Sequence, residues 1–258
     1  MPTALVTGAS RGVGRGVAIG LAEAGFKVFG TGRSIETADL PTTINRIRCD
    51  HLNDTEPAAA FERVAAEAGS LDVLVNSAWG GYERMVEDGA FTWALPFWQQ
   101  PTHRWTGMID VGVRAAWVAS SHAARLMIAA QKGLIVNVSS WPAQKYIGNL
   151  IYGVSKAAAD KMTFDMAHEL RRYGVATVSL YPGLVRTEAV MQAAKEGWFD
   201  LSNSESPEFI GRVVAALFHD PGLMERSGKV LVAAQVALEL GIRDVDGRQP
   251  TPLTLETA

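Results

Sequence analysis

Short runs of β-branched and aliphatic residues alternate with longer segments of helical periodicity along this chain of 258 residues, and this alternation constrains its fold most. The predicted strands are Ala4–Thr7, Lys27–Thr31, Ile44–Cys49, Leu71–Asn76, Leu134–Val138, Ala176–Leu180 and Lys229–Val232. Several runs are almost continuously apolar, as expected for strands that are covered on both faces. Alternating strands and helices imply parallel strands joined by right-handed crossovers. The sequence therefore predicts an α/β fold with a doubly wound parallel sheet.

Glycines mark the ends of three predicted helices. These helices run from Val13 to Ala24 before Gly25, from Thr55 to Ala68 before Gly69, and from Ser155 to Arg172 before Gly174. Doubly wound sheets bind ligands beyond the carboxyl ends of their strands. Functional residues are therefore expected directly after Thr7, Thr31, Cys49, Asn76, Val138 and Leu180.

Composition excludes several classes of function. The formal net charge is -3 and no block of Lys or Arg occurs, so nucleic acid is not an expected partner. Cys49 is the one cysteine, which excludes an internal disulfide and a cysteine-built metal site. The five histidines show no ligand spacing, so no catalytic metal is expected. No apolar run approaches the ~18 residues of a membrane span and no signal peptide is visible, so we expect a cytoplasmic protein without membrane contact.

A glycine-rich turn follows the first predicted strand. It reads Thr7-Gly8-Ala9-Ser10-Arg11-Gly12-Val13-Gly14 and leads into a helix. Glycine lets the backbone approach a pyrophosphate closely, while the helix N-terminus faces the anion. Gly12, Gly16 and Gly20 also leave one helix face bare for close packing. A purely structural glycine turn is the alternative, but its place after the first strand of a βαβ unit favours a dinucleotide site.

The end of the second strand indicates which dinucleotide is bound. A 2′-hydroxyl is normally held by an acidic residue at this point and a 2′-phosphate by arginine. The segment reads Thr31-Gly32-Arg33, with no carboxylate before Glu36, and Arg11 offers a second guanidinium. Forked guanidinium donors suit a phosphate better than a hydroxyl. The alternative is that Arg33 is a solvated loop residue; together the features favour NADP(H) over NAD(H).

A tyrosine and a lysine stand four residues apart after the fifth strand, as Tyr152-Gly153-Val154-Ser155-Lys156. On a helix they share one face. A tyrosine loses its proton near pH 10, so acid–base work at neutral pH requires a nearby cation such as the Lys156 ammonium. A serine at the strand end, within Ser139-Ser140, would donate to a substrate carbonyl. This Tyr-Lys spacing also occurs by chance on many helices.

Taken in order, these motifs resemble the short-chain dehydrogenase/reductase family. The marks are the Thr7–Gly14 loop, Asp50 after the third strand, Asn76-Ser77-Ala78 after the fourth, Ser140, the Tyr152/Lys156 pair and Pro182-Gly183-Leu184-Val185-Arg186-Thr187 after the sixth. The resemblance implies one Rossmann-type domain with a seven-stranded parallel sheet and helices on both faces. Residues 1–130 would mainly bind the cofactor, residues 131–235 would form the catalytic and substrate half, and residues 236–258 a C-terminal tail.

The same resemblance implies roles for individual residues. Ser140, Tyr152 and Lys156 would be catalytic; Ser139 has the commoner spacing from the tyrosine, but the Ser-Ser pattern points to the second serine. Asp50 would contact the adenine, Asn76 would lie under the adenosine ribose, and Val185 and Thr187 would contact the nicotinamide carboxamide. The full set of expected cofactor contacts is Gly8, Ser10, Arg11, Gly12, Val13, Gly14, Arg33, Asp50, Asn76, Ala78, Tyr152, Lys156, Pro182, Gly183, Val185 and Thr187.

One position departs from the family pattern. Gly112, within Ile109-Asp110-Val111-Gly112-Val113-Arg114, stands where many members have an asparagine whose backbone bends a helix and holds a water beside the lysine. Glycine also accommodates an irregular helix. The departure therefore bears on the expected proton relay through that water and not on the hydride transfer. Segments such as Arg243-Asp244-Val245-Asp246-Gly247-Arg248 further resemble a mammalian branch that shares this glycine. That branch implies an NADPH-dependent reductase of steroids and other carbonyl compounds.

Aromatic residues crowd the connections expected to face the substrate. Trp79, Trp141 and Trp198 flank motif positions and are the candidates for a pocket that takes bulky apolar or aromatic carbonyl compounds. A structural role is the expected one for Phe91, Trp93, Phe97 and Phe199. The sequence thus predicts a reductase of a small-molecule ketone, aldehyde or quinone, with the reverse oxidation of an alcohol left open. The alternative is a catalytically weak NADP(H)-binding sensor, favoured only by Gly112. By resemblance we expect a homodimer or homotetramer formed through helices around Thr106–Ala130 and Ser155–Arg172.

Overall fold

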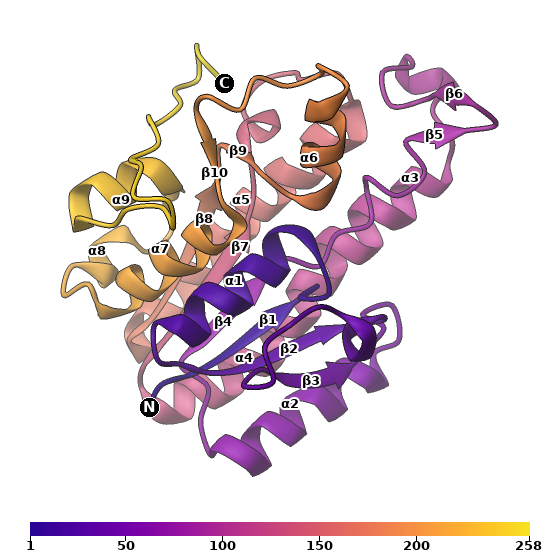
Figure 1. Ribbon diagram of the computed structural model, residues 1–258. Coiled ribbons are helices and arrows are strands. Elements are labelled where there is room, and N and C mark those ends of the chain that lie inside the picture. Colours follow the sequence, from indigo (N-terminus) through magenta and orange to yellow (C-terminus); the bar gives the residue numbers. More distant parts are fainter.

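A seven-stranded parallel sheet forms the centre of the computed structural model, which describes all residues from Met1 to Ala258 (Figure 1). Its strands are β1 (Thr3–Thr7), β2 (Lys27–Gly32), β3 (Asn45–Arg48), β4 (Val73–Asn76), β7 (Gly133–Val138), β8 (Val175–Tyr181) and β11 (Val230–Val232). They lie in the order β11-β8-β7-β4-β1-β2-β3. All seven predicted strands form, and the doubly wound fold is confirmed. The order reverses between β1 and β4, the point at which such sheets bind ligands.

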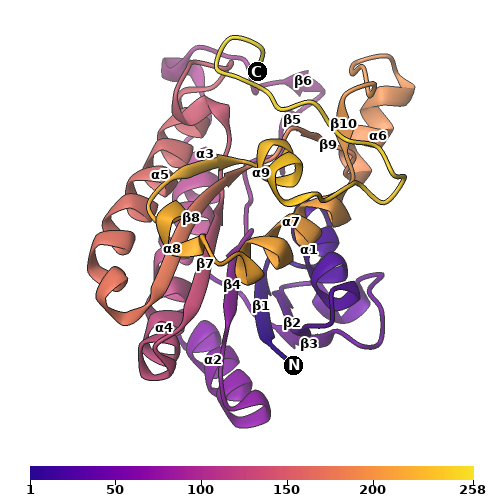
Figure 2. The ribbon, with the colours of Figure 1, turned by 90° about the vertical axis from the view of Figure 1, so that its left-hand side faces the viewer.

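Helices cover both faces of this sheet, as Figure 2 shows. They are α1 (Gly12–Glu23), α2 (Thr55–Ala68), α3 (His103–Trp105), α4 (Ala115–Ala130), α5 (Leu150–Leu170), α6 (Glu188–Lys195), α7 (Pro207–His219), α8 (Leu223–Arg226) and α9 (Ala233–Leu240). The side chains of β1 alternate between two cores. Ala4 and Val6 pack with α1, α7 and α9, whereas Leu5 packs with α2 and α4. Burial on both faces explains why the strands read as continuous apolar runs.

Two short strand pairs lie outside the main sheet. The β5 (Val86–Glu87) and β6 (Ala90–Phe91) strands form an antiparallel hairpin within the long connection after β4. The β9 (Leu184–Val185) and β10 (Ser204–Glu205) strands pair in parallel and flank α6. Both pairs emerge from connections that follow the carboxyl ends of main-sheet strands, which is where the functional site was expected.

Helix α5 begins earlier than the sequence predicted. It starts at Leu150 instead of Ser155, because the Asn149 side chain caps it by accepting a hydrogen bond from the Tyr152 backbone N–H at 3.0 Å. Asparagine is a strong N-cap residue, and Asn149 is buried. The predicted start at Ser155 was therefore wrong, and Tyr152 lies in the first turn of the helix. At the other end, Gly174 adopts the left-handed conformation after a 3₁₀ turn.

Glycines let α1 approach α7 closely. A Cβ atom at Gly20 would lie 3.0 Å from the Cα atom of Gly211, and a Cβ atom at Gly16 would overlap Pro207. The bare helix face predicted from the four-residue glycine spacing is thus used for packing. Because α1 begins at the glycine-rich turn and α7 begins just after β10, this contact fixes the two segments relative to each other.

The C-terminal residues pack onto the body of the protein. Helix α9 crosses the expected boundary between residues 235 and 236, and Val236 and Ala237 are buried in the same core as α1 and α7. A turn forms at Asp244–Gly247, with the Gly247 N–H donating to the Asp244 carbonyl at 2.9 Å. No helix in the structure combines the length and the apolarity needed to span a membrane.

Candidate active site

The glycine-rich turn lies against the segment that follows β4. Gly8 has a φ of 69°, and a Cβ atom there would lie 2.7 Å from the Cα atom of Ala78. The hydroxyl of Thr7 accepts hydrogen bonds from the N–H groups of Ser77 and Ala78, each at 3.1 Å. This close backbone approach requires glycine because any side chain would collide with the neighbouring main chain. The turn therefore places the N-terminus of α1 at the edge formed by the carboxyl ends of the strands.

Groups suited to bind anions face this edge. The Gly12 N–H at the start of α1 donates to the carboxylate of Glu188 at 3.0 Å, which places a negative charge at the helix N-terminus. The hydroxyl of Ser10 is buried without a hydrogen-bond partner, as is the Oδ1 atom of Asn76. A backbone N–H at a helix N-terminus, a hydroxyl and an amide oxygen are groups that can hydrogen-bond a dinucleotide. The residues present therefore fit such a cofactor.

Two arginines converge beside the end of β2. The Arg11 guanidinium forms an ion pair with the Glu83 carboxylate, and the Arg33 guanidinium approaches the same two oxygens at 3.2 and 3.3 Å. The structure thus brings together the two residues expected to meet a 2′-phosphate. Sequence reasoning did not find Glu83, because a single acidic residue fifty positions from Arg33 carries no pattern.

The residues after β3 are occupied by local contacts. The Asp50 carboxylate accepts the Leu52 N–H at 3.0 Å, in a turn of its own. The neighbouring His51 is buried, and its Nε2 atom lies 2.8 Å from the Thr31 hydroxyl. Burial lowers the pKa of His51 to about 4, so the ring is neutral at physiological pH. His51 therefore ties the ends of β2 and β3 together.

Ser140, Tyr152 and Lys156 meet at the ends of β7 and α5. The Ser140 hydroxyl lies 2.9 Å from the Tyr152 hydroxyl, whereas the Ser139 hydroxyl donates to the Lys156 carbonyl at 3.3 Å. Of the two serines, Ser140 faces the tyrosine. The Lys156 ammonium donates to the Val138 carbonyl at 3.1 Å, and burial lowers its pKa to about 8. Capping by Asn149 fixes the first turn of α5 and with it the direction of Tyr152.

Aromatic side chains enclose the Tyr152 ring. The ring centroids of Trp93, Trp79 and Tyr82 lie 5.3, 5.6 and 6.0 Å from it. The Tyr82 hydroxyl donates to the Tyr152 hydroxyl at 2.9 Å, and the Tyr82 residue is 53% exposed. Asn149 also binds the Trp93 carbonyl at 2.9 Å. Trp93, which was expected to have a structural role, thus lies beside Tyr152, and so does Tyr82, another aromatic residue of the connection after β4.

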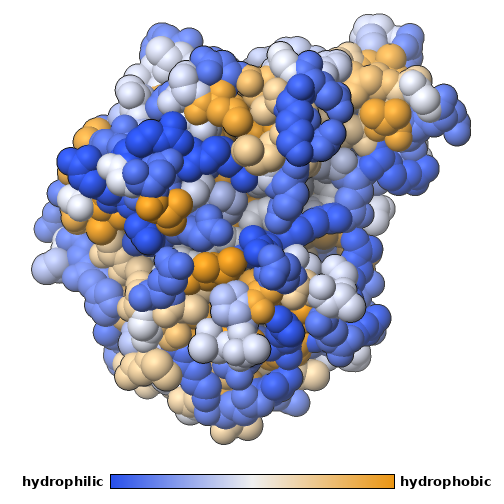
Figure 3. Space-filling view, viewed as in Figure 1, coloured by the Kyte–Doolittle hydropathy of each residue, from blue (hydrophilic) through white to orange (hydrophobic).

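The other predicted aromatic residues lie elsewhere. Trp141 packs edge-on against Tyr181 at 5.3 Å, and the Trp198 side chain is 69% exposed beyond α6. Figure 3 shows hydrophobic surface over the β5–β6 hairpin and its flanking segments. Phe91 and Phe97 of this region are 51% and 61% exposed, so they do not pack as interior structural residues. Trp79 is the predicted pocket residue that the structure brings to Tyr152.

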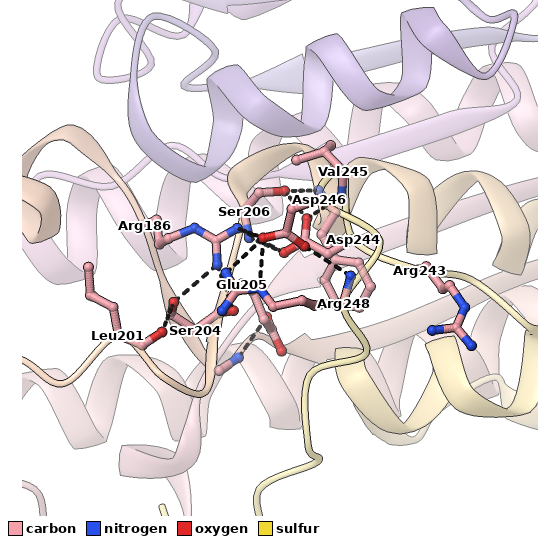
Figure 4. Close-up of polar contacts among 12 residues, drawn as sticks. Arg186, Leu201, Ser204, Glu205, Ser206, Arg243, Asp244, Val245, Asp246 and Arg248 are labelled. Carbon is pink, nitrogen blue, oxygen red and sulfur yellow. Dashed lines mark hydrogen bonds and ion pairs between the residues drawn. The ribbon is translucent and has the colours of Figure 1, made fainter.

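The segment from Pro182 to Thr187 is held by a buried polar cluster (Figure 4). The Gly183 N–H donates to the Glu205 carboxylate at 2.9 Å, and burial raises the pKa of Glu205 to about 7. Arg186 donates to the Asp244 carboxylate at 3.0 Å and to the Ser204 carbonyl at 2.8 Å. The hydroxyl of Thr187 caps α6. These contacts place Val185, which is buried, and Thr187 next to the glycine-rich turn, since the Thr187 methyl group would lie 3.6 Å from a Cβ atom at Gly12.

Comparisons with known proteins agree with this geometry. The family model described as short chain dehydrogenase matches residues 2–197. The chain is 42% identical to the mouse protein "Dehydrogenase/reductase SDR family member 1" over 95% of its own length and 83% of the relative's, which confirms the mammalian resemblance. Two solved structures share the fold at 24% identity. One is a Brucella melitensis protein titled ribose-5-phosphate isomerase (TM-score 0.76, 90% of each chain covered). The other is a short-chain type dehydrogenase/reductase from Mycobacterium marinum (TM-score 0.72, 90% of this chain and 93% of that one). The chain therefore belongs to the short-chain dehydrogenase/reductase family of oxidoreductases.

Proposed function

We propose that this protein is an NADP(H)-dependent reductase of bulky apolar carbonyl compounds, namely ketones, aldehydes or quinones. The observation that carries the cofactor preference is the convergence of Arg11 and Arg33 on one carboxylate beside the end of β2. Two forked guanidinium groups around one anion suit a phosphate group better than a ribose hydroxyl. The loop after β2 also lacks a carboxylate before Glu36 that would accept from a 2′-hydroxyl.

The bound nicotinamide supplies the hydride in such a reaction. The protein's own residues orient and protonate the carbonyl oxygen. The Ser140 hydroxyl donates a hydrogen bond to that oxygen, and the Tyr152 hydroxyl, which lies 2.9 Å from Ser140, delivers the proton. The Lys156 ammonium stabilises the resulting phenolate because its positive charge lies on the same face of α5. Gly8, Gly12 and the start of α1 would hold the pyrophosphate, and Val185 and Thr187 the carboxamide.

The substrate class follows from the surroundings of Tyr152. The aromatic rings of Trp79, Tyr82 and Trp93 lie with their centroids within 6.0 Å of its ring centroid, in tilted or edge-to-face arrangements. Aromatic walls of this kind favour large apolar or aromatic carbonyl compounds over small polar ones, because burying polar groups there without partners is unfavourable. Polar side chains reach the Tyr152 hydroxyl only from Ser140 and Tyr82.

Assembly through α4 and α5 is part of the proposal. Trp117 of α4 and Phe164 of α5 are 56% and 62% exposed, which is unusual for such large side chains on long helices. A homodimer or homotetramer would bury both. Sedimentation equilibrium tests this directly, and a monomer at micromolar concentration would overturn it.

The function is tested by binding and by single turnover. NADPH and NADH are titrated by fluorescence against the wild-type protein, Arg33→Ala and, as a matched control, Arg63→Ala, whose arginine pairs with Glu67 away from the site. We expect tight NADPH binding that Arg33→Ala weakens at least tenfold and Arg63→Ala leaves unchanged. Bound NADPH is then mixed with apolar ketones, aldehydes and quinones, and its oxidation is followed for wild type and Tyr152→Phe. Equal affinity for NADPH and NADH, or equal rates in Tyr152→Phe, would overturn the proposal.

A further inference from the structure

The indole of Trp79 covers the ammonium group of Lys156. The Lys156 Nζ atom lies 4.1 Å from the Trp79 ring centroid, within the range of a cation–π contact. The only hydrogen bond of this ammonium is to the Val138 carbonyl, at 3.1 Å. The indole thus faces a charge that has few polar partners, and it does so from the segment directly after β4.

Glycines leave the space that the indole of Trp79 occupies. A Cβ atom at Gly112 would lie 2.9 Å from both Cε3 and Cζ3 of Trp79, and a Cβ atom at Gly81 would lie 2.5 Å from its Cζ2. The Gly80 N–H donates to the Gly107 carbonyl at 3.1 Å, which brings the two backbones into contact beside the ring. Gly107 and Gly112 belong to the π-helical stretch Thr106–Arg114. Small residues on both segments therefore leave room for one large flat ring.

The polar atom of the indole takes no part in this arrangement. Trp79 Nε1 is buried without a hydrogen-bond partner. Because this N–H has no partner, Trp79 acts on the site through its ring, which contacts both Lys156 and Tyr152.

We propose that Trp79 is a positioning residue for Lys156, which holds the lysine ammonium in place through the face of its indole, and that glycine at position 112 is required to admit that ring. The inference rests on the proposed function, since it assigns the ammonium beside Tyr152 a task in the reaction. It also explains the departure from the family pattern. An asparagine side chain at position 112 would occupy the space of the indole.

The ring face stabilises the charged form of the lysine. Burial alone disfavours an ammonium, and the pKa of Lys156 lies at about 8. The titratable groups that face it are Asp160 and Tyr152 from its own helix and Tyr82, which bonds to Tyr152, from the segment after β4. Of these, Asp160 favours the charged form, and the negative face of the indole acts in the same direction.

The test measures the pKa of Lys156 without cofactor or substrate. Trace acetylation over a range of pH, followed by mass spectrometry of the Lys156 peptide, is carried out on wild type, Trp79→Phe and Trp79→Leu. Phe and Leu both shorten the side chain, but only Phe keeps an aromatic face. We expect the pKa of Lys156 in Trp79→Leu to lie about half a unit to one unit below that in Trp79→Phe. Identical titrations in the two variants would overturn the proposal, because a purely space-filling role makes no such distinction.

A second pair of variants tests the glycine. Gly112→Asn alone should displace the indole and lower the pKa of Lys156, as Trp79→Leu does. The double variant Trp79→Ala/Gly112→Asn should have a higher melting temperature than Gly112→Asn. Trp98→Leu, which changes a 70% exposed tryptophan, is the matched control and should leave Lys156 unchanged. A Gly112→Asn protein with the wild-type melting temperature and titration would contradict the inference. This test is independent of the proposed function. If the pKa of Lys156 shifts in the variants as expected but the protein does not bind NADPH, the proposed function alone is overturned.

Discussion

The buried carboxylate of Asp244 lies 3.0 Å from the guanidinium of Arg186, so the C-terminal turn is joined to the loop after β8. The same carboxylate accepts the Ser206 N–H at 2.8 Å at the start of α7 (Figure 4). Arg186 stands between Val185 and Thr187, the residues proposed to contact the nicotinamide carboxamide. The C-terminal residues therefore support, from outside, the loop that is proposed to bind the cofactor.

Asp244→Asn should destabilise the protein strongly, because it leaves the guanidinium of Arg186 only partly compensated in a buried cluster. Removing one partner of a buried ion pair costs about 3–5 kcal/mol in unfolding free energy. Urea unfolding followed by circular dichroism measures the loss. Asp246→Asn, on the more exposed carboxylate that Arg186 also approaches, is the control and should change little. Equal effects of the two variants would contradict the assignment.

Glu205→Gln should stabilise the protein at alkaline pH. Burial raises the pKa of Glu205 from 4.5 to about 7, so the folded state favours the protonated form. The stability that this proton contributes is complete below pH 4.5 and is lost as the pH rises through 7, a change of about 3 kcal/mol. Glutamine stays neutral and still accepts from the Gly183 N–H. The variant should therefore have a higher melting temperature than the wild type at pH 8 but not at pH 4.5. The same difference in melting temperature at both pH values would show that the carboxyl does not titrate as described.

Glu83→Gln should strengthen the binding of NADPH. The Glu83 carboxylate lies on both Arg11 and Arg33 and competes with a 2′-phosphate for them. Because the three side chains are exposed, the gain should be modest, about two- to fivefold in the dissociation constant. The affinity for NADH, which lacks the phosphate, should change less. Glu87→Gln, which lies on the same connection and pairs with Arg84, is the matched control. Weaker NADPH binding in Glu83→Gln would mean that the carboxylate assists the cofactor.

Gly20→Ala should destabilise the protein even though alanine is the better helix former. In a free helix this change contributes about 1 kcal/mol of stability. Here the added Cβ atom would press on the Glu208 carbonyl and on Gly211 of α7. Overpacking of this kind costs about 1–3 kcal/mol, which exceeds the gain in helix propensity. Denaturant midpoints report the sign, and a stabilised variant would show that α1 and α7 can separate without loss.

The sheet was predictable from sequence because burial on both faces leaves short apolar runs, and these runs alternate with longer segments of helical period. The convergence of Ser140, Tyr152 and Lys156 followed from two facts, the end of β7 and a four-residue spacing on one helix. Arg33 was found because it stands directly after β2, and Arg11 because it lies in the glycine-rich turn between β1 and α1. These predictions depended on regular backbone, whose side-chain directions repeat.

The residues near the site to which sequence analysis gave no specific role lie in the long connection between β4 and the π-helical stretch. Tyr82, Glu83 and Trp93 have no periodicity, and their directions are set by contacts distant in sequence. Asn149 donates a hydrogen bond to the Trp93 carbonyl, fifty-six positions away, which holds the backbone of Trp93 next to the start of α5. The same asparagine caps α5, so one buried side chain joins the start of this helix to the connection that carries Trp93.

Two carboxylates lie on the groups proposed to bind phosphates, Glu83 on the arginines and Glu188 on the Gly12 N–H. Arrival of a phosphorylated cofactor at these groups is an ion exchange, in which one anion leaves as another enters. The net charge of the anion sites then changes little, and the affinity depends less steeply on ionic strength than the number of arginines suggests. Glu83 lies on the connection after β4 and Glu188 is the first residue of α6, so a single ligand would release both segments at once.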